Sequence, residues 1–331
     1  MKVSVALCTY NGERYLHQQL ASLVAQERAP DELVVCDDNS SDSALAILKE
    51  FAESAPFEVR VTANATNLGS SKNFERAISL CTGDVVFLAD QDDVWLPEKI
   101  KLMCAKFEVD NEVGLVMSDA EVVNTDLRSS NTTLWRRAGF DETAHAIVRT
   151  GDAFAELLKH SATFGLTMAF RSSYKNLILP LPATTAVPNS PLMIHDAWIA
   201  LLIAAVARVE IVDEVLTLYR QHDQQQTGAR GFWTDARRRR TTFQAINKTA
   251  FMTAAETYQA LRQCLMSDAR CRVSPHGWQR FDEMTKHARA RGAMPRTRWQ
   301  RLAIIGRELA SGRYARWSNG VMSAVKDMIS G

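Results

Sequence analysis

The first 120 residues alternate between short apolar runs and longer segments whose apolar residues have helical spacing. Four runs have the length and composition of strands: Val3–Leu7, Leu33–Cys36, Glu58–Thr62 and Asp84–Leu88. Strands that alternate with helices of 10–15 residues predict βαβ units and a mostly parallel sheet. The pattern therefore predicts an α/β fold with flanking helices.

The pattern changes twice further along the chain. Residues 113–228 mix strand-like and helical segments, at Gly114–Met117, Gly165–Phe170, Ile194–Val206 and Val209–Tyr219. Beyond Gly228 the pattern is helical and rich in arginine. We therefore expect an α/β domain over 1–228, with halves 1–112 and 113–228, and a basic helical region over 229–331.

Each predicted strand of the first half leads into polar residues. These read CTYN at 8–11, DDNS at 37–40, NLG at 67–69 and DQDD at 90–93. Ligands of open α/β sheets bind beyond the carboxyl ends of the strands. The four polar endings therefore predict one ligand site at that edge of the sheet.

The carboxylates Asp90, Asp92 and Asp93 have the chemistry of a site for a hard divalent cation, Mg²⁺ or Mn²⁺. The alternative is an Asp-rich N-cap for a helix opened by Pro97. Neither G-x-G-x-x-G after the first strand nor G-x-x-x-x-G-K-[ST] occurs. We therefore expect a metal, rather than a glycine-rich loop, to hold any phosphates.

Charge separates the two regions, although the 331-residue chain has a net charge of only +1. Residues 230–331 carry 20 Lys and Arg against 7 Asp and Glu, and the preceding residues are acidic. The run Arg237–Arg240 and the basic region fit a solvated face, contact with anionic lipid, or subunit contacts such as a homodimer. We do not expect nucleic acid as a partner, because no binding motif accompanies the arginines.

The six cysteines lack a CxxC pair, which favours reduced thiols. Met1 leads directly into a strand pattern, and the longest apolar stretch, Ala197–Ala207, is about half a membrane span. We expect a cytoplasmic protein without a signal peptide or bilayer-crossing helix. Peripheral contact with the inner face of the plasma membrane would come through the basic region.

Over residues 1–228 the sequence resembles the family 2 (GT-A fold) nucleotide-sugar glycosyltransferases. The resemblance rests on VALCTYNGERYL, VVCDDNSSD, NLGSSKNFERAI, GDVVFLADQDDVW, HDAW and LYRQH. DQDDVW followed by HDxW is most similar to bacterial rhamnosyltransferases. The resemblance implies an inverting, metal-dependent transfer of a sugar, with L-rhamnose from dTDP-rhamnose as the expected donor sugar. The acceptor would be a hydroxyl of a growing surface polysaccharide, such as O-antigen, or of a lipid-linked oligosaccharide. Residues 1–112 would then bind the donor and residues 113–228 the acceptor.

The resemblance also assigns roles to residues. Thr9, Tyr10 and Glu13 match positions that hold base and ribose, and Asp38 matches the carboxylate on the pyrimidine edge. Asn67 and Lys72 match the stretch that approaches base or diphosphate, and Asp90 and Asp92 are expected to bind the donor. His222 matches a histidine that completes the metal site with Asp92 or Asp93, or contacts the diphosphate; the alternative is a structural histidine. We also expect Arg220 to neutralise phosphate charge. We expect Asp92 to face the donor sugar or ribose and Asp93 to bind a metal that bridges it to the diphosphate, although the spacing leaves open which of the two is the metal ligand. Asp37 is expected to support its loop.

The sequence His195-Asp196-Ala197-Trp198 carries the predicted general base, Asp196. An acceptor hydroxyl must lose its proton as it attacks, so a base must lie within hydrogen-bond reach. The alternative for Asp196 is a plain N-cap, and Asp213 and Glu214 are other candidate bases, on a strand-like run. Other functions left open are a non-catalytic sugar-nucleotide-binding module, a UDP-hexose transferase, and a nucleotidyltransferase, which would need a basic glycine-rich loop.

Overall fold

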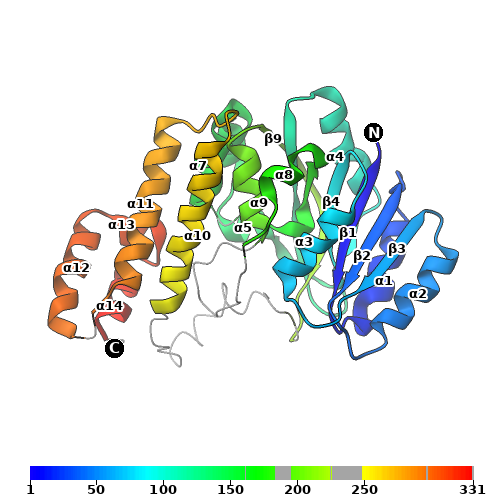
Figure 1. Ribbon diagram of the computed structural model, residues 1–331, viewed down its shortest axis with the longest axis horizontal. Coiled ribbons are helices and arrows are strands. Elements are labelled where there is room, and N and C mark those ends of the chain that lie inside the picture. The colour runs from blue at the N-terminus through cyan, green and yellow to red at the C-terminus, as the bar shows by residue number, and fades with distance from the viewer. Residues whose placement is uncertain (161, 183–194, 224, 226–247, 296, 330–331) are drawn as a thin grey trace. The chain divides into compact units, whose positions relative to one another are not determined.

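The computed structural model describes residues 1–160, 162–182, 195–223, 225, 248–295 and 297–329. The chain divides into two compact units, one from residues 1–183 with 194–222 and one from the remainder. The predicted boundary at 228/229, like Arg237–Arg240, lies outside the described residues. Each unit is described by itself below (Figure 1).

The first unit is built on one sheet. Its strands are β1 (Val3–Thr9), β2 (Glu32–Asp37), β3 (Glu58–Ala63), β4 (Val85–Asp90), β5 (Val94–Trp95), β6 (Val113–Val123), β7 (Ser129–Thr133), β8 (Met168–Arg171) and β9 (Arg208–Arg220). The order is β3-β2-β1-β4-β8-β6-β9-β5, with β7 paired to β6. Strands β3, β2, β1 and β4 are parallel, as predicted.

The second half of the sheet is mixed. Strand β8 runs antiparallel to both β4 and β6, whereas β6 and β9 are parallel. The apolar pattern could not show this reversal, because a strand buried on both faces reads alike in either direction. The predicted strand Gly165–Phe170 is a 3₁₀ turn at Gly165–Thr167 followed by β8.

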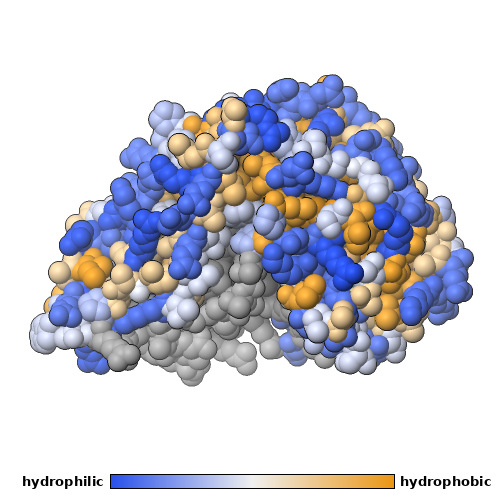
Figure 2. Space-filling model, viewed as in Figure 1, coloured by the Kyte–Doolittle hydropathy of each residue, from blue (hydrophilic) through white to orange (hydrophobic). Residues whose placement is uncertain are grey.

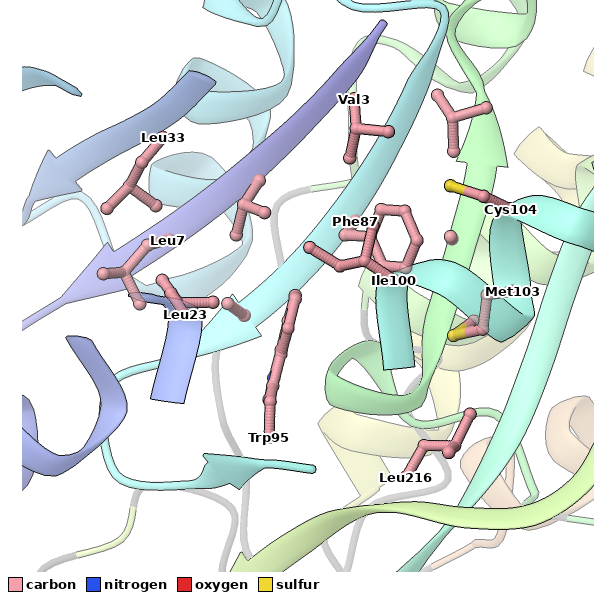
Figure 3. Packing of buried hydrophobic residues seen from close by; sticks show 14 of the residues in the cluster. Val3, Leu7, Leu23, Leu33, Phe87, Trp95, Ile100, Met103, Cys104 and Leu216 are labelled. Atoms are coloured by element: carbon pink, nitrogen blue, oxygen red, sulfur yellow. The ribbon is translucent and has the colours of Figure 1, made fainter. Parts of the chain in front are cut away.

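Helices cover both faces of the sheet. Apolar residues of α1 (Glu13–Val24), α2 (Ala44–Ser54) and α4 (Lys99–Val109) share one buried cluster with alternate residues of β1 and β4. In Figure 3 the side chains of Leu7, Leu23, Phe87, Trp95 and Ile100 gather in this cluster. On the other face α3 (Ser70–Leu80) lies against β1 and β2, and α9 (His195–Ala204) lies against β6 and β9. The polar strand ends therefore project from a rigid, close-packed base.

Short helices complete this unit: α5 (Leu134–Ala138), α6 (Glu142–Ile147), α7 (Ala153–Lys159) and α8 (Lys175–Ile178). The second unit contains helices α10 (Lys248–Ser267), α11 (Pro275–Gly292), α12 (Arg298–Ala310), α13 (Arg313–Trp317) and α14 (Val321–Ile329). The predicted α/β fold with a helical C-terminal extension is confirmed. Within the described ranges, every helix is too short or too polar to cross a bilayer.

Candidate active site

Hydrogen bonds between side chains fix the loops that follow β1 and β2. The Thr9 Oγ1 hydroxyl donates to Asp37 Oδ2 (2.8 Å), and the Ser40 backbone N–H donates to Asp37 Oδ1 (2.9 Å). Thr9 and Asp37 are both buried. Asp37 therefore supports its loop, and Thr9 joins that loop to the end of β1.

Asp38 holds the loop that leads into α3. Its Oδ1 accepts hydrogen bonds from Asn64 Nδ2 and from the backbone N–H of Leu68, and its Oδ2 accepts one from the backbone N–H of Gly69, each at 2.8 Å. Gly69 has a φ of +81°, a conformation that favours glycine. The buried Asp38 carboxylate thus organises a loop of the predicted donor pocket with three of its acceptor positions in use.

The other predicted donor residues lie around the same edge. Glu13 is exposed, and its Oε2 accepts from the backbone N–H of Ser43 (2.9 Å), which lowers the pKa of Glu13. Asn67 is exposed at the loop before α3. Lys72 Nζ donates to Glu75 Oε2 at 2.7 Å and is partly exposed. These three side chains come from α1, from the loop before α3 and from α3 itself, which follow β1 and β3, the strands on either side of β2 in the sheet.

Gln91 joins the first and fourth strand ends, and the sequence analysis missed it. Its Oε1 accepts from the Tyr10 backbone N–H (2.8 Å), and its Nε2 donates to the Tyr10 carbonyl (3.0 Å). A Cβ on Gly12 would lie 2.1 Å from Gln91 Oε1, so this contact requires glycine there. The one available signal was an amide inside an otherwise acidic loop. Tyr10 itself is exposed, next to this bridge.

The acidic loop after β4 turns its carboxylates in different directions. His222 Nε2 lies 2.7 Å from Asp92 Oδ2. Asp93 is buried, and its Oδ1 accepts from the backbone N–H of Arg220 at 3.1 Å. The structure therefore brings His222 to Asp92, whereas Asp93 points into the protein toward the end of β9.

Arg220 contacts the acidic loop from inside the protein. Its guanidinium donates from Nε to the Asp92 carbonyl (2.8 Å) and from Nη1 to the Thr125 carbonyl (2.6 Å), and it lies over the Tyr15 ring, 4.6 Å from the centroid. The side chain is fully buried. Arg220 therefore contacts the acidic loop rather than offering its N–H groups at the surface.

Lys99 is a buried cation beneath the same loop, and sequence reasoning missed it too. Its Nζ donates to Thr217 Oγ1 (2.7 Å) and to the Leu166 carbonyl. Burial lowers the pKa of Lys99 to about 7, although the charges of Asp93 and Asp90 oppose the shift. A lysine at a helix start reads as a surface residue, because its burial depends on strands far away in sequence.

The carboxylates of the acidic loop are costly to ionise without a bound cation. Burial, followed by the charges of Asp92 and Asp196, raises the pKa of Asp90 to about 7. Burial, followed by the charges of Asp92 and Asp90, raises the pKa of Asp93 well above its usual range. Within the described residues Asp93 Oδ2 is buried without a hydrogen-bond partner. Cationic neutralisation would therefore stabilise the ionised loop.

Asp196 occupies the first turn of α9, where the resemblance expects the base. Its Oδ1 accepts from the backbone N–H of Ala197 (2.7 Å), and its Oδ2 accepts from that of Gly165 (3.3 Å). Burial raises the pKa of Asp196 to about 7. A Cβ on Gly165 would lie 3.7 Å from Leu88 Cδ1 and 3.9 Å from Asp196 Cβ, so Asp196 lies near the end of β4. Its charge also raises the pKa of Asp90, the last residue of that strand. A carboxyl poised near neutral pH beside the acidic loop is suited to general-base work.

His195 packs rather than titrates near neutral pH. Its ring stacks on Phe74 with centroids 4.4 Å apart, and burial lowers its pKa to about 4. The other candidate bases, Asp213 and Glu214, are exposed on β9, and Asp213 pairs with His145 and Arg149.

The residues at the acidic loop fit a cation that is shared with a ligand. Within the described ranges, no group of three or more His, Cys, Asp or Glu could hold a metal ion by itself. Asp92 and His222 provide one oxygen and one nitrogen donor side by side. One or two protein ligands completed by substrate phosphates is the usual arrangement for Mg²⁺ at phosphate-transfer sites.

Similarity to known proteins agrees with this geometry. The profile of the family described as "Glycosyl transferase family 2" matches residues 4–177. An uncharacterized glycosyltransferase of Nostoc sp. is 28% identical over 67% of this chain and 65% of its own length. The dTDP-rhamnosyl transferase RfbG of Shigella flexneri is 35% identical over 29% of this chain and 34% of its own. The chain thus spans between about one third and two thirds of the length of these relatives.

Solved structures show the same fold at low identity. TarS of S. aureus, residues 1–349 in complex with UDP-GlcNAc, matches with a TM-score of 0.60 and 16% identity over 98% of this chain and 90% of that one. The mannosyltransferase PcManGT of Pyrobaculum calidifontis, in complex with GDP-Man and Mn²⁺, matches with a TM-score of 0.51 and 17% identity over 99% and 86%. The fold is thus the GT-A fold, and the family profile covers just over half of the chain. This protein belongs to glycosyl transferase family 2.

Proposed function

We propose that the protein is a metal-dependent, inverting glycosyltransferase that moves a sugar from a nucleoside diphosphate to an acceptor hydroxyl. The observation that carries the proposal is the placement of Asp196, a buried carboxyl with a pKa near 7. It accepts a hydrogen bond from Gly165, which also lies against Leu88 of β4, the strand that leads into the acidic loop of Asp90–Asp93. A non-catalytic binding module would not require a carboxyl whose ionised form is destabilised by burial.

The protein's own residues account for the transfer step. Ionised Asp196 takes the proton of the acceptor hydroxyl as its oxygen forms a bond to the anomeric carbon. The bond from that carbon to the diphosphate breaks on the opposite face, and its electron pair leaves with the nucleoside diphosphate. Attack opposite the leaving group inverts the anomeric configuration.

We assign Asp92 and His222 as the side chains that would hold Mg²⁺ or Mn²⁺, because they face each other at 2.7 Å. A bound cation would supply positive charge against the diphosphate as it leaves. Asp93, with Oδ1 bonded to the backbone of Arg220, supports the loop from inside. Arg220 then acts as a positioning residue for Asp92, through the Asp92 carbonyl, rather than as a phosphate ligand.

Thr9, Tyr10, Glu13, Asn67 and Lys72 complete the proposed donor pocket from the β1 and β3 sides. Asp38 has one acceptor position beyond the three used by the protein, and we propose that it meets the N–H of a pyrimidine base. Asp90, near both Asp92 and Asp196, would lie between the nucleotide and the reacting sugar.

We propose dTDP-L-rhamnose as the donor, supported by the dTDP-rhamnosyl transferase RfbG among the relatives. A UDP-hexose is the second candidate, because another relative is the UDP-Glc-dependent enzyme WfgD of Escherichia coli, 26% identical over 38% of this chain. That relative's acceptor is a diphosphoundecaprenol-linked sugar, which supports a lipid-linked acceptor here. Such an acceptor would place the protein at the inner face of the membrane.

The proposal is tested by thermal shift with dTDP-rhamnose, UDP-glucose, UDP-GlcNAc and GDP-mannose, each with and without Mn²⁺. The true donor should raise the melting temperature in a metal-dependent way. Slow hydrolysis of that donor by the wild type, and its loss in Asp196→Asn with donor binding retained, would support catalysis. A variant that binds and turns over the donor as the wild type does would refute the role of Asp196.

A further inference from the structure

Two helices of the second unit expose several large apolar side chains and bury charged ones, beside a small apolar cluster that includes Ile305 and Ala324. Helix α12 buries Arg301, Ile305 and Glu308, and α14 buries Ser323, Ala324 and Asp327. The exposed side chains on the same helices form what we call the outer face: Trp299, Leu302, Leu309, Val321, Met322, Val325 and Ile329. A helix of a soluble protein ordinarily has the opposite arrangement.

Specific polar contacts fix this orientation. Asp327 accepts two hydrogen bonds from the Arg291 guanidinium, both at 2.7 Å, and a third from the Tyr314 hydroxyl at 2.6 Å. Glu308 Oε2 lies 2.8 Å from His287 Nδ1. Buried charges are tolerated when they are paired in this way. The outer face therefore points outward because its helices are anchored by their polar sides.

The outer face is strongly exposed. The exposed fractions of Trp299, Val321 and Met322 are 79%, 67% and 64%. Figure 2 shows hydrophobic colour at the surface over α12, among hydrophilic residues. Helical spacing puts Trp299, Leu302 and Leu309 along one side of α12 and the four residues of α14 along one side of that helix, and the two helices contact each other. Apolar side chains arranged in this way indicate an interaction surface rather than ordinary scatter.

Charge identifies the partner. Among residues 297–329 the acidic side chains, Glu308 and Asp327, are both buried and paired. The exposed charged residues there are all basic, namely Arg298, Arg307, Arg316 and Lys326, of which Arg316 pairs with Glu283 of α11 at 3.2 Å. An amphipathic helix pair with apolar and basic side chains outward is suited to the interface of an anionic bilayer. A second copy of the chain, docked face to face, would instead bring these basic residues toward one another.

We propose that the outer face of α12 and α14 docks the protein onto an anionic lipid surface, with its apolar side chains inserted at the headgroup level. The basic side chains beside them supply the attraction to anionic headgroups. This inference does not depend on the transfer reaction, so its failure would leave the proposed function intact.

The test is co-sedimentation of the full chain with vesicles of phosphatidylcholine and phosphatidylglycerol, against phosphatidylcholine alone, at low and high salt. Binding should require the anionic lipid and weaken with salt. Met322→Gln should lower the partition coefficient about tenfold, because it removes an apolar side chain from the interface. Met266→Gln, at a methionine of α10 with 67% exposure, is the matched control and should bind as the wild type does.

Lys326→Gln should weaken binding about fivefold at low salt, since a basic residue near an anionic surface contributes on the order of 1 kcal/mol. Lys286→Gln, also exposed on the second unit, is its control. Unchanged melting temperatures would show that the variants are folded. Equal binding by Met322→Gln and Met266→Gln, or no binding by the wild type, would overturn the proposal. A dimer that Met322→Gln abolishes, without vesicle binding, would overturn it in favour of a second copy.

Discussion

Replacing the proposed base by asparagine should make the protein more stable at alkaline pH while it removes turnover. Asp196 is buried, and its pKa is raised from 3.8 to about 7. The unfolded chain ionises this carboxyl near pH 4, whereas the folded protein holds the proton until about pH 7. Ionised Asp196 therefore destabilises the folded state. The resulting loss of unfolding free energy grows between pH 4 and 7 and reaches its full size above pH 7.

The size of the effect follows from the shift. About three pKa units correspond to about 4 kcal/mol. Asparagine carries no charge and avoids this cost, but it has one carbonyl oxygen, so the bond from the Gly165 N–H to Oδ2 is lost. That loss costs about 1 kcal/mol. Asp196→Asn should therefore gain about 3 kcal/mol at pH 8, and nothing, or a loss of about 1 kcal/mol, at pH 4.

Urea unfolding of the metal-free protein at several pH values measures this difference. Asp213→Asn is the control, because Asp213 is exposed on β9 and its ion pair with Arg149 contributes about 1 kcal/mol at most. After Mn²⁺ is restored to the same preparations, Asp196→Asn should lose about 10²–10⁴-fold in turnover, whereas Asp213→Asn should keep it. An Asp196→Asn protein that is no more stable than the wild type at pH 8 would refute the assignment of a raised pKa to this carboxyl.

Three further outcomes follow from the same site. Wild-type turnover at saturating donor should rise with pH through about 7, because Asp196 acts only when ionised; a flat profile between pH 6 and 8 would contradict this. Lys99→Met should lower the free energy of unfolding in urea by about 2–4 kcal/mol, because the Thr217 hydroxyl and the Leu166 carbonyl lose their buried donor. Lys101→Met, at an exposed lysine, should change that free energy little. His222→Ala should raise the Mn²⁺ concentration for half-maximal activity at least about tenfold, whereas His17→Ala, at an exposed histidine, should leave it unchanged. If His222→Ala needs the same Mn²⁺ concentration as the wild type, His222 is not a metal ligand.

The first half of the fold could be predicted because its signals are local. Apolar runs of strand length, helical spacing between them and polar endings all lie within a few residues of one another, and β1 to β4 follow them closely. The direction of β8 could not be predicted, because it depends on pairing between β4 and β6 rather than on its own four residues. The resemblance and the family profile agree on the family.

The sequence could propose a set of site residues but not how they are arranged. Spacing alone could not separate Asp92 from Asp93, because adjacent residues of a turn can face either way. The contact that distinguishes them, from His222 to Asp92, joins residues 130 apart in sequence. Lys99 and Gln91 were missed for the same reason, since their partners lie on distant strands and loops.

The acidic loop and the end of β9 behave as one structural element. Arg220 holds Asp93 through its backbone N–H and the Asp92 carbonyl through its guanidinium, and His222 lies two residues further along. The proposed metal side chains are therefore set in place by protein contacts before any cation or diphosphate binds. The same contacts confine carboxylates that repel one another, so the loop carries electrostatic strain in the free protein. Binding of a cation with the donor would relieve that strain without reorganising the loop, which would couple metal affinity to donor affinity.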